Sequence, residues 1–181
     1  DKFLKDHGGD VDGLILRGQI LHSQRRFEAA MLPLESAIQS DPNNPVAHYS
    51  LGVTLISMGS TARGISELLE AKRLRPAMIE TYKALAAVAL RSGDMALLRE
   101  NAQSLIGAQP RSAEGYLFRA TASGRSGNAT SAAADLRKAM LVAPEDSRPI
   151  VALGQLRSAQ KRFSAATELF DQALTKNPRD L

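Results

Sequence analysis

The sequence contains no cysteine and no tryptophan, and aromatic residues make up only 4% of its 181 residues. Without cysteine the chain has no disulfide bond, no thiol nucleophile and no zinc site built on cysteine. No apolar run approaches the ~20 residues that a membrane-spanning helix needs. The absences exclude several classes of protein but leave the cellular compartment open.

Motifs of known catalytic chemistry are also missing. The histidines His7, His22 and His48 lie far apart in the sequence, and none belongs to a His-Glu-x-x-His zinc motif. There is no phosphate-binding Gly-x-x-x-x-Gly-Lys loop and no Gly-x-Ser-x-Gly nucleophile elbow. Acidic pairs at helical spacing, such as Glu67 and Glu70, are typical of solvated helix faces. The sequence therefore predicts no enzyme, no cofactor and no metal site.

The net charge of +4 is spread along the chain without a block of like charge. A nucleic-acid interface would cluster basic residues and interleave them with aromatic ones. We therefore expect no nucleic-acid partner.

What the sequence does contain is an internal repeat. Five prolines recur at intervals of 34 residues: Pro42, Pro76, Pro110, Pro144 and Pro178. A period of 34 is typical of a helix–turn–helix unit that stacks on its neighbours. It divides the chain into repeats 11–44, 45–78, 79–112, 113–146 and 147–180, with residues 1–10 as the tail of a preceding repeat.

Several places of the repeat carry a constant type of residue. The eighth place is always small: Gly18, Gly52, Ala86, Ala120 and Gly154. The twentieth and twenty-seventh places are mostly alanine or glycine, and the twenty-fourth is mostly large, as in Leu34, Leu68, Leu136 and Phe170. This pattern resembles the tetratricopeptide repeat family over residues 11–180. The resemblance implies an all-α fold: one continuous right-handed α-solenoid, or superhelix, of five tetratricopeptide helix–turn–helix repeats.

Helix signals recur within the repeats. In the first repeat we expect helices from Asp12 to about Ser23 and from Phe27 to about Gln39. In the second, Asn44 is a cap followed by Pro45, Gly59 ends the first helix, and Gly64 marks a close helix crossing.

The third repeat is the least regular, with Leu98 and Leu105 where small residues are expected. The fourth repeat has features that weaken it. Arg119 stands where a large apolar residue is expected, and Ser123-Gly124 lies at a helix end. We therefore expect the fourth repeat to open before the second. In the fifth repeat we expect an inward stripe of Phe163, Ala166, Phe170, Ala173 and Leu174.

A binding surface follows from the family resemblance. If the fourth, eighth and eleventh places of each first helix are buried, the second, fifth, ninth and thirteenth places point the other way. In the family these places line the concave groove. The candidate peptide-binding groove consists of Ile15, Gln19, Tyr49, Val53, Lys83, Ala87, Leu117, Thr121, Arg125, Arg148 and Gln155. Its mixed character favours a peptide with apolar side chains near Tyr49 and Val53 and acidic groups near Lys83 and Arg148. A carboxylate clamp for chaperone tails is not supported, because Ala87, Phe118 and Ala152 stand at places where the clamp needs polar or basic residues.

Two functions remain open at this point. The first is a protein–protein interaction scaffold that binds a peptide or a partner helix in its groove, as part of a longer repeat array. The alternative is a regulatory or targeting arm of a larger enzyme or of a secretion or export machine, with the chemistry outside this chain. The Ala- and Arg-rich repeats are similar to bacterial tetratricopeptide proteins of envelope and exopolysaccharide export. The absence of cysteine fits a bacterial cytoplasm or a bacterial periplasm equally. An uncovered last repeat would also allow weak self-association.

Overall fold

The computed structural model describes residues 10–177, and these contain ten α-helices and no strand. The helices are α2 (Val11–Ser23), α3 (Phe27–Ser40), α4 (Pro45–Ser57), α5 (Thr61–Leu74), α6 (Ile79–Ser92), α7 (Met95–Ala108), α8 (Ala113–Arg125), α9 (Ala129–Val142), α10 (Arg148–Ala159) and α11 (Phe163–Lys176). This confirms the all-α fold class and the two helices expected in the first repeat. Most of the expected N-terminal tail, together with Pro178, lies outside the described residues.

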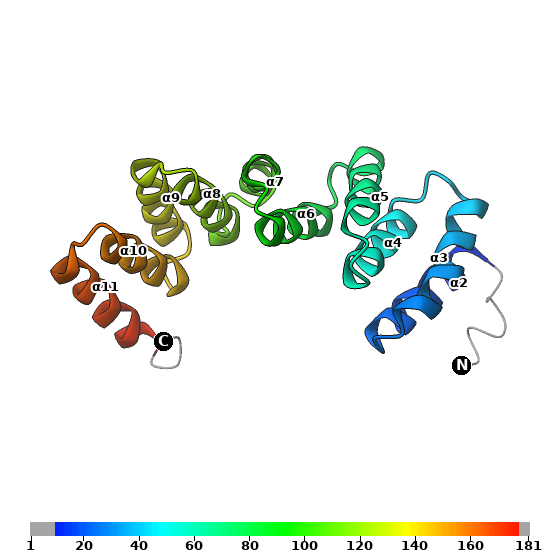
Figure 1. Ribbon diagram of the computed structural model, residues 1–181, viewed down its shortest axis with the longest axis horizontal. Coiled ribbons are helices and arrows are strands. Elements are labelled where there is room, and N and C mark those ends of the chain that lie inside the picture. The colour runs from blue at the N-terminus through cyan, green and yellow to red at the C-terminus, as the bar shows by residue number, and fades with distance from the viewer. Residues whose placement is uncertain (1–9, 178–181) are drawn as a thin grey trace. The chain divides into compact units, whose positions relative to one another are not determined.

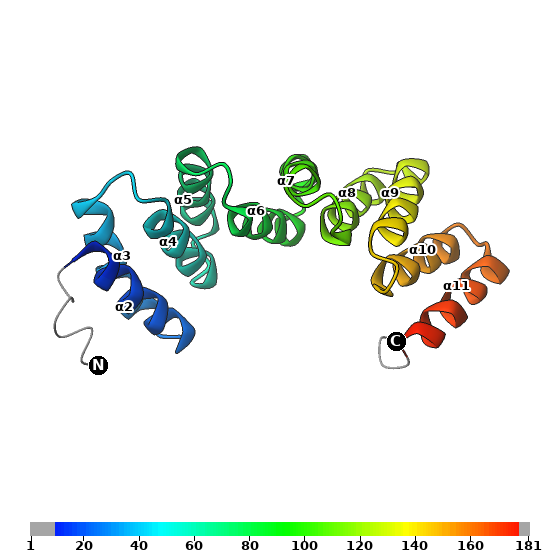
Figure 2. The same ribbon diagram turned by 180° about the vertical axis from the view of Figure 1, so that it is seen from behind.

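Consecutive helices form antiparallel pairs that contact one another directly. In Figure 1, α2 lies beside α3 and α4 beside α5. Figure 2 shows from behind that α8 lies beside α9 and α10 beside α11. Neighbouring pairs also touch, since α3 contacts α4 and α9 contacts α10. Helices such as α3 and α9 therefore pack both on their own partner and on the next pair, as helices of a helical-repeat protein do.

The contacts divide the chain into two compact units, Asp1–Val88 and Ala89–Leu181, and the boundary falls inside α6. Each unit has a core of its own. In the first unit Ala30, Leu34, Leu51 and Leu55 pack together. In the second, Ala120, Ala132, Ala133, Leu136 and Leu153 do so. The finer division into five repeats stays a prediction.

The turn inside each helix pair contains a residue in the left-handed region, and these residues are again 34 apart. Three of them are glycines, Gly59, Gly93 and Gly127, with φ of 86°, 79° and 81°. The other two are Arg25 and Lys161, each with φ of 60°. Glycine adopts this conformation freely, whereas a residue with a Cβ is strained in it. The turn geometry is thus set by the repeat and kept even where glycine is absent.

Side-chain caps begin several helices as the sequence predicts. The Asn44 side chain accepts hydrogen bonds from the backbone N–H groups of Val46 and Ala47, at 3.1 and 3.2 Å. Asp94 does the same for Ala96 and Leu97 at the start of α7. Each cap satisfies backbone donors that have no partner within the helix.

The small residues permit close packing. A Cβ on Gly64 would lie 2.8 Å from the carbonyl oxygen of Gly52 and 2.5 Å from Ile56 Cγ1, so α4 and α5 cross there at backbone distance. A Cβ on Gly18 would lie 2.4 Å from Leu34 Cγ, which confirms that a small eighth place accommodates a large twenty-fourth place. These contacts compensate for the low helix propensity of glycine.

Two expectations about buried positions are wrong. Phe163 is 63% exposed and Leu174 is 40% exposed, whereas both were expected on the inward stripe of α11. Phe27, the counterpart of Phe163, packs its ring 5.1 Å from that of His22, but Ser158 occupies the place of His22 in the fifth repeat. Because α11 is the last described helix, no further described helix packs over Leu174.

Arg119 keeps its place in the fourth repeat by pairing with a carboxylate. Its Nε and Nη2 donate to the two oxygens of the buried Asp135 at 3.0 and 2.6 Å, and its Nη1 donates to Gln103. A two-pronged ion pair with a neutral neighbour satisfies charges that would otherwise be costly to desolvate. That the fourth repeat opens before the second stays a prediction.

Candidate peptide-binding surface

The first unit carries a hollow of about 420 Å³ between α2 and α4. It is lined by Gln19, His22, Tyr49, Ser50 and Val53. Three of these residues were expected in the groove. The lining combines an aromatic ring and an aliphatic side chain with amide, imidazole and hydroxyl groups. Binding sites commonly have this composition, because apolar side chains supply contact area and a few polar groups orient the ligand.

Hydrogen bonds between the two helices fix the polar side of this hollow. Gln19 Nε2 donates to Ser50 Oγ at 3.0 Å. Thr54 Oγ1 donates its proton to the carbonyl oxygen of Ser50 at 2.8 Å and lies 3.0 Å from His22 Nδ1. Because the hydroxyl proton is already used, Nδ1 must be the donor to Thr54. His22 Nε2 is then the ring nitrogen that can accept a proton or a hydrogen bond.

Burial changes the titration of two residues that line the hollow. It lowers the pKa of His22 below its ordinary value of 6.5, because the charged imidazolium is less well solvated there. Burial, followed by the negative charge of Glu80, raises the pKa of Tyr49 above its ordinary value of 10.0. At neutral pH the hollow therefore presents a neutral imidazole and a protonated phenol.

The second unit has two adjoining hollows along α10. One, of about 230 Å³, includes Thr121 and Arg125 from α8 together with Ala152 and Gln155 from α10. The other, of about 210 Å³, is lined by Ser147, Arg148, Val151, Ala152 and Gln155. Both include Ala152 and Gln155, so the two hollows lie next to each other, and together they are called the depression along α10. Its floor is made of small and aliphatic side chains.

The two arginines of this depression differ in how far their charge is neutralised. Both Nε and Nη2 of Arg148 donate to the carboxylate of Asp146, with Nη2 2.7 Å from Oδ2. The hydrogen bond from Arg148 also lowers the pKa of Asp146 below its ordinary value of 3.8. Arg125 donates to the carbonyl oxygen of Leu90 at 3.1 Å and has no carboxylate partner among residues 10–177. Arg125 is therefore the stronger attraction for an anionic group.

Comparisons with known proteins identify the fold. The family model described as TPR repeat matches residues 18–59. Among curated proteins, none matches the sequence. The structure is similar to that of MamA from Desulfovibrio magneticus RS-1, with a TM-score of 0.82 and 19% identity over 94% of this chain and 97% of that chain. It is also similar to YrrB, described as a TPR protein with an unusual peptide-binding site, with a TM-score of 0.78 and 16% identity over 99% and 92% of the two chains. The chain has the fold of a tetratricopeptide repeat protein.

A third tetratricopeptide structure, a thermophilic protein from Thermus thermophilus, is similar over 94% of this chain and 93% of that chain, with a TM-score of 0.65 and 20% identity. At these identities the comparisons establish the tetratricopeptide fold and not a shared ligand. The candidate surface must therefore be judged from this chain's own residues.

The tetratricopeptide fold brings most of the expected groove residues into these hollows, but not all. Ile15 is buried against Ala37 and Ala47, because the small side chain of Ala47 lets α4 close over it. Leu117 is half-buried and packs on the core of the second unit. Lys83 and Ala87 lie on α6, half-buried and exposed, and neither is among the residues that line the hollow of the first unit.

Sequence reasoning missed two residues of the hollow in the first unit, His22 and Ser50. They stand at the twelfth and sixth places of their repeats, one turn or less from the ninth and fifth places that were considered. A wider stripe on α2 and α4 would have included both.

The described residues show no constellation for catalysis by metal. Between residues 10 and 177 there is no group of three or more His, Asp or Glu side chains that could hold an ion. The one imidazole in a hollow, His22, is oriented by the hydroxyl of Thr54 and not by a carboxylate. In the same range, no helix is long and apolar enough to cross a membrane.

Proposed function

We propose that this chain is a protein-interaction scaffold that binds a peptide or a partner helix on its first-helix surface. The name first-helix surface covers two separate hollows, that of α2 and α4 in the first unit and the depression along α10 in the second. The observation that carries the proposal is the hollow beside Tyr49, which combines apolar walls with polar groups that hydrogen bonds between α2 and α4 hold in place. The tetratricopeptide fold supports it, since proteins with this fold bind peptides or protein partners.

The chemistry of the two hollows suggests the character of the ligand. Tyr49 and Val53 offer surface for an apolar side chain, and helices or extended peptides commonly anchor through such contacts. In the second unit Arg125 offers a positive charge next to small side chains. We infer a partner segment with apolar anchors and some acidic residues. We expect an acidic group of the ligand to contact Arg125 and not Arg148, because Arg148 already forms an ion pair with Asp146.

A peptide library displayed on phage, selected against the whole chain, provides a probe for this surface. Selected peptides are then titrated against the Tyr49→Ala variant. Loss of a central aromatic contact should weaken binding by about tenfold or more. The matched control is Leu32→Ala, which removes a side chain that is 73% exposed on α3 and lies outside this hollow.

The outcomes separate clearly. Weaker binding to Tyr49→Ala with unchanged binding to Leu32→Ala supports the first-helix surface as the site. Selected peptides that bind both variants as tightly as the original chain would exclude the hollow of the first unit. Circular dichroism and melting of both variants show whether a loss of binding reflects a loss of fold.

A further inference from the structure

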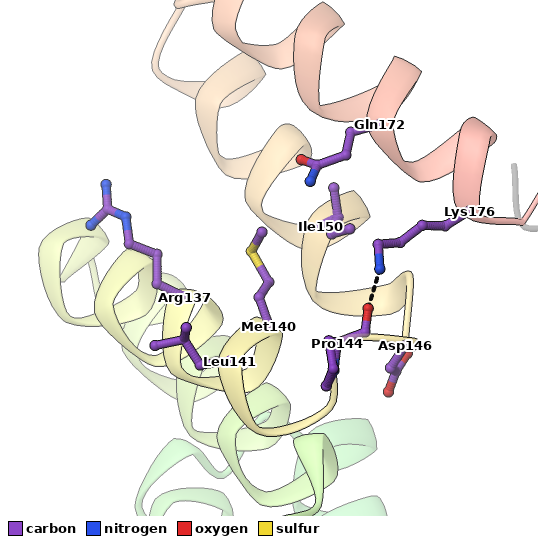
Figure 3. Close-up of a pocket in the computed structure, with 8 residues that line it drawn as sticks. All are labelled: Arg137, Met140, Leu141, Pro144, Asp146, Ile150, Gln172 and Lys176. Atoms are coloured by element: carbon purple, nitrogen blue, oxygen red, sulfur yellow. Dashed lines mark hydrogen bonds between the residues drawn. The ribbon is translucent and has the colours of Figure 1, made fainter.

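A different hollow, of about 450 Å³, lies between α9 and α11 with α10 behind it. Figure 3 shows Met140 and Leu141 on one side, Gln172 and Lys176 on the other, and Ile150 between them. Leu141 is 75% exposed and lies beside the hollow. None of these residues belongs to the first-helix surface.

The hollow exists at the place that an aromatic or imidazole ring occupies in the preceding repeats. The fourth place of the second to fifth repeats holds His48, Tyr82, Tyr116 and Ile150. In the second unit, Tyr116 is buried in a cluster against which Ile106 and Val142 pack. The residues equivalent to Ile106 and Val142 in the next repeat are Met140 and Lys176, both in the lining of the hollow. Ile150 is 2% exposed, yet it is smaller than the tyrosine it replaces.

The carbonyl oxygen of the proline that precedes the fourth place also indicates that a ring is missing in the fifth repeat. Tyr82 donates its hydroxyl to the carbonyl oxygen of Pro76 at 2.5 Å. His48 Nε2 lies 3.0 Å from the carbonyl oxygen of Pro42, so it can donate to that oxygen. In the fifth repeat no ring is present, and Lys176 Nζ donates to the carbonyl oxygen of Pro144 instead (Figure 3). This proline carbonyl is thus an acceptor for the ring in the second and third repeats and for Lys176 in the fifth.

The rim of the hollow is positively charged overall. Arg137 is exposed and has no ion-pair partner among the described residues, and Lys176 is held by a neutral carbonyl. The acidic member of the lining, Asp146, is already neutralised by Arg148. A ligand that enters here meets an apolar wall, a carbonyl acceptor and two cations. This combination fits an aromatic side chain with a hydroxyl group and adjacent carboxylates.

We propose that the hollow between α9 and α11 is a second binding site, which takes a tyrosine side chain from an acidic segment of a partner protein. The ring packs against Met140 and Leu141 and stands in for the missing ring of the fifth repeat. Its hydroxyl displaces Lys176 from the carbonyl oxygen of Pro144, and the released ammonium pairs with a carboxylate of the segment. The site is separate from the first-helix surface and does not depend on it.

The probe is the blocked pentapeptide Glu-Asp-Tyr-Asp-Glu, titrated into the whole chain with ¹³C-labelled methyl groups of isoleucine and methionine. We expect saturable shifts of the Ile150 and Met140 methyl signals. The same peptide with alanine in place of tyrosine should bind about tenfold more weakly or not at all, because an anchor in a pocket carries most of the affinity. Equal shifts with both peptides, or no saturable shift, would overturn the proposal.

Two variants test the place of the ring. Ile150→Tyr restores the residue type of the preceding repeats and should fill the hollow, so the pentapeptide should lose its binding. Ile150→Val leaves the hollow open and should retain binding. If Ile150→Tyr folds poorly, Leu141→Gln serves instead. Position 141 is exposed, and the equivalent residue of the first repeat is Gln39, so the fold should tolerate glutamine. Leu141→Gln should also weaken binding of the pentapeptide about tenfold.

The oligomeric state of the chain separates a partner from a second copy. The exposed ring of Phe163 in another molecule would be the competing occupant. Light scattering at high concentration should show the same mass for the original chain and for Ile150→Tyr. A concentration-dependent dimer that Ile150→Tyr abolishes would overturn the proposal in favour of self-association.

Discussion

Thr54 and Thr81 are both completely buried, but only the hydroxyl of Thr54 has a hydrogen-bond partner. Thr54 Oγ1 donates to the carbonyl oxygen of Ser50 and accepts from His22. Thr81 Oγ1 has no partner among the described residues. A buried hydroxyl without a hydrogen bond costs its full desolvation, whereas a bonded one does not.

Thr81→Val should therefore stabilise the chain by about 1 kcal/mol, since it removes an unsatisfied hydroxyl and keeps the shape of the side chain. Thr54→Val should destabilise it by about 1–2 kcal/mol, because it leaves His22 without its acceptor. Urea unfolding of both variants measures the difference. Equal effects of the two substitutions would show that the hydroxyl of Thr81 has a partner after all.

The hydroxyl groups of Tyr82 and Tyr116 should also differ in their contribution to stability. Tyr82→Phe removes the hydrogen bond to Pro76 and should cost about 1 kcal/mol. The hydroxyl of Tyr116 has no hydrogen-bond partner within residues 10–177, so Tyr116→Phe should change the stability by less than about 0.5 kcal/mol. The free energy of unfolding in urea checks both values. A cost for Tyr116→Phe as large as that for Tyr82→Phe would contradict the assignment.

The strained turn of the last helix pair offers a stabilising substitution. Lys161 is in the left-handed region, which costs a residue with a Cβ roughly 1–2 kcal/mol. Lys161→Gly removes that strain but increases the entropy of the unfolded chain, so the net gain should be about 0.5 kcal/mol. Gly59→Ala is the reverse control: no atom lies within 4 Å of the added Cβ, so its loss of stability would come from the backbone conformation alone. Thermal unfolding of both variants gives the two signs.

The stability of the first unit should fall when the pH drops below about neutral. The pKa of His22 is lower in the folded chain than its ordinary value of 6.5. Above that value His22 is neutral in both states and adds no pH dependence. As the pH falls through 6.5 and then through the folded pKa, the unfolded chain binds the proton first, so stability is lost.

The variant His22→Asn isolates this contribution, because its amide can still donate to Thr54. The difference in unfolding free energy between the original chain and His22→Asn should shrink from about pH 7.5 to about pH 5, a range of about 2.5 units that includes the ordinary pKa of histidine. The folded pKa values of Glu70 and Asp146 are also lowered, but they affect a more acidic range and are the same in both proteins. A difference that does not change with pH would contradict the burial of His22.

How much of this structure the sequence predicts depends on how local each feature is. The cap of Asn44 and the turn at Gly59 follow from residue type, because each involves neighbours only a few residues away. The period of 34 fixes the helix pairs. The strained turn at Lys161 could be inferred only by aligning it with glycines of other repeats, since lysine itself gives no signal for that conformation.

The candidate site is less accessible to sequence reasoning. Ile15 was expected on an open surface, but the neighbouring helix carries Ala47 opposite it and closes over it. Arg119 was expected to weaken the fourth repeat, because it is a charged residue at an apolar place. Its partners are Asp135 and Gln103, which lie on other helices, each 16 residues away in the sequence. The hollow at Ile150 appears only when one compares the size of the residue at one place in successive repeats. All three features depend on how the helices are rotated and on the volumes of the facing side chains. A periodic sequence pattern alone specifies neither.

The bonds that join neighbouring helix pairs span about one repeat of sequence: 31 residues from Gln19 to Ser50, 32 from His22 to Thr54 and 32 from Lys176 to Pro144. Only a short loop must close before each contact forms, so little chain entropy is lost in reaching it. Chains dominated by such nearby contacts fold quickly, and folding can start in any helix pair and spread to the next. During synthesis, the pair of α2 and α3 could be structured as soon as α4 leaves the ribosome, well before α11 exists.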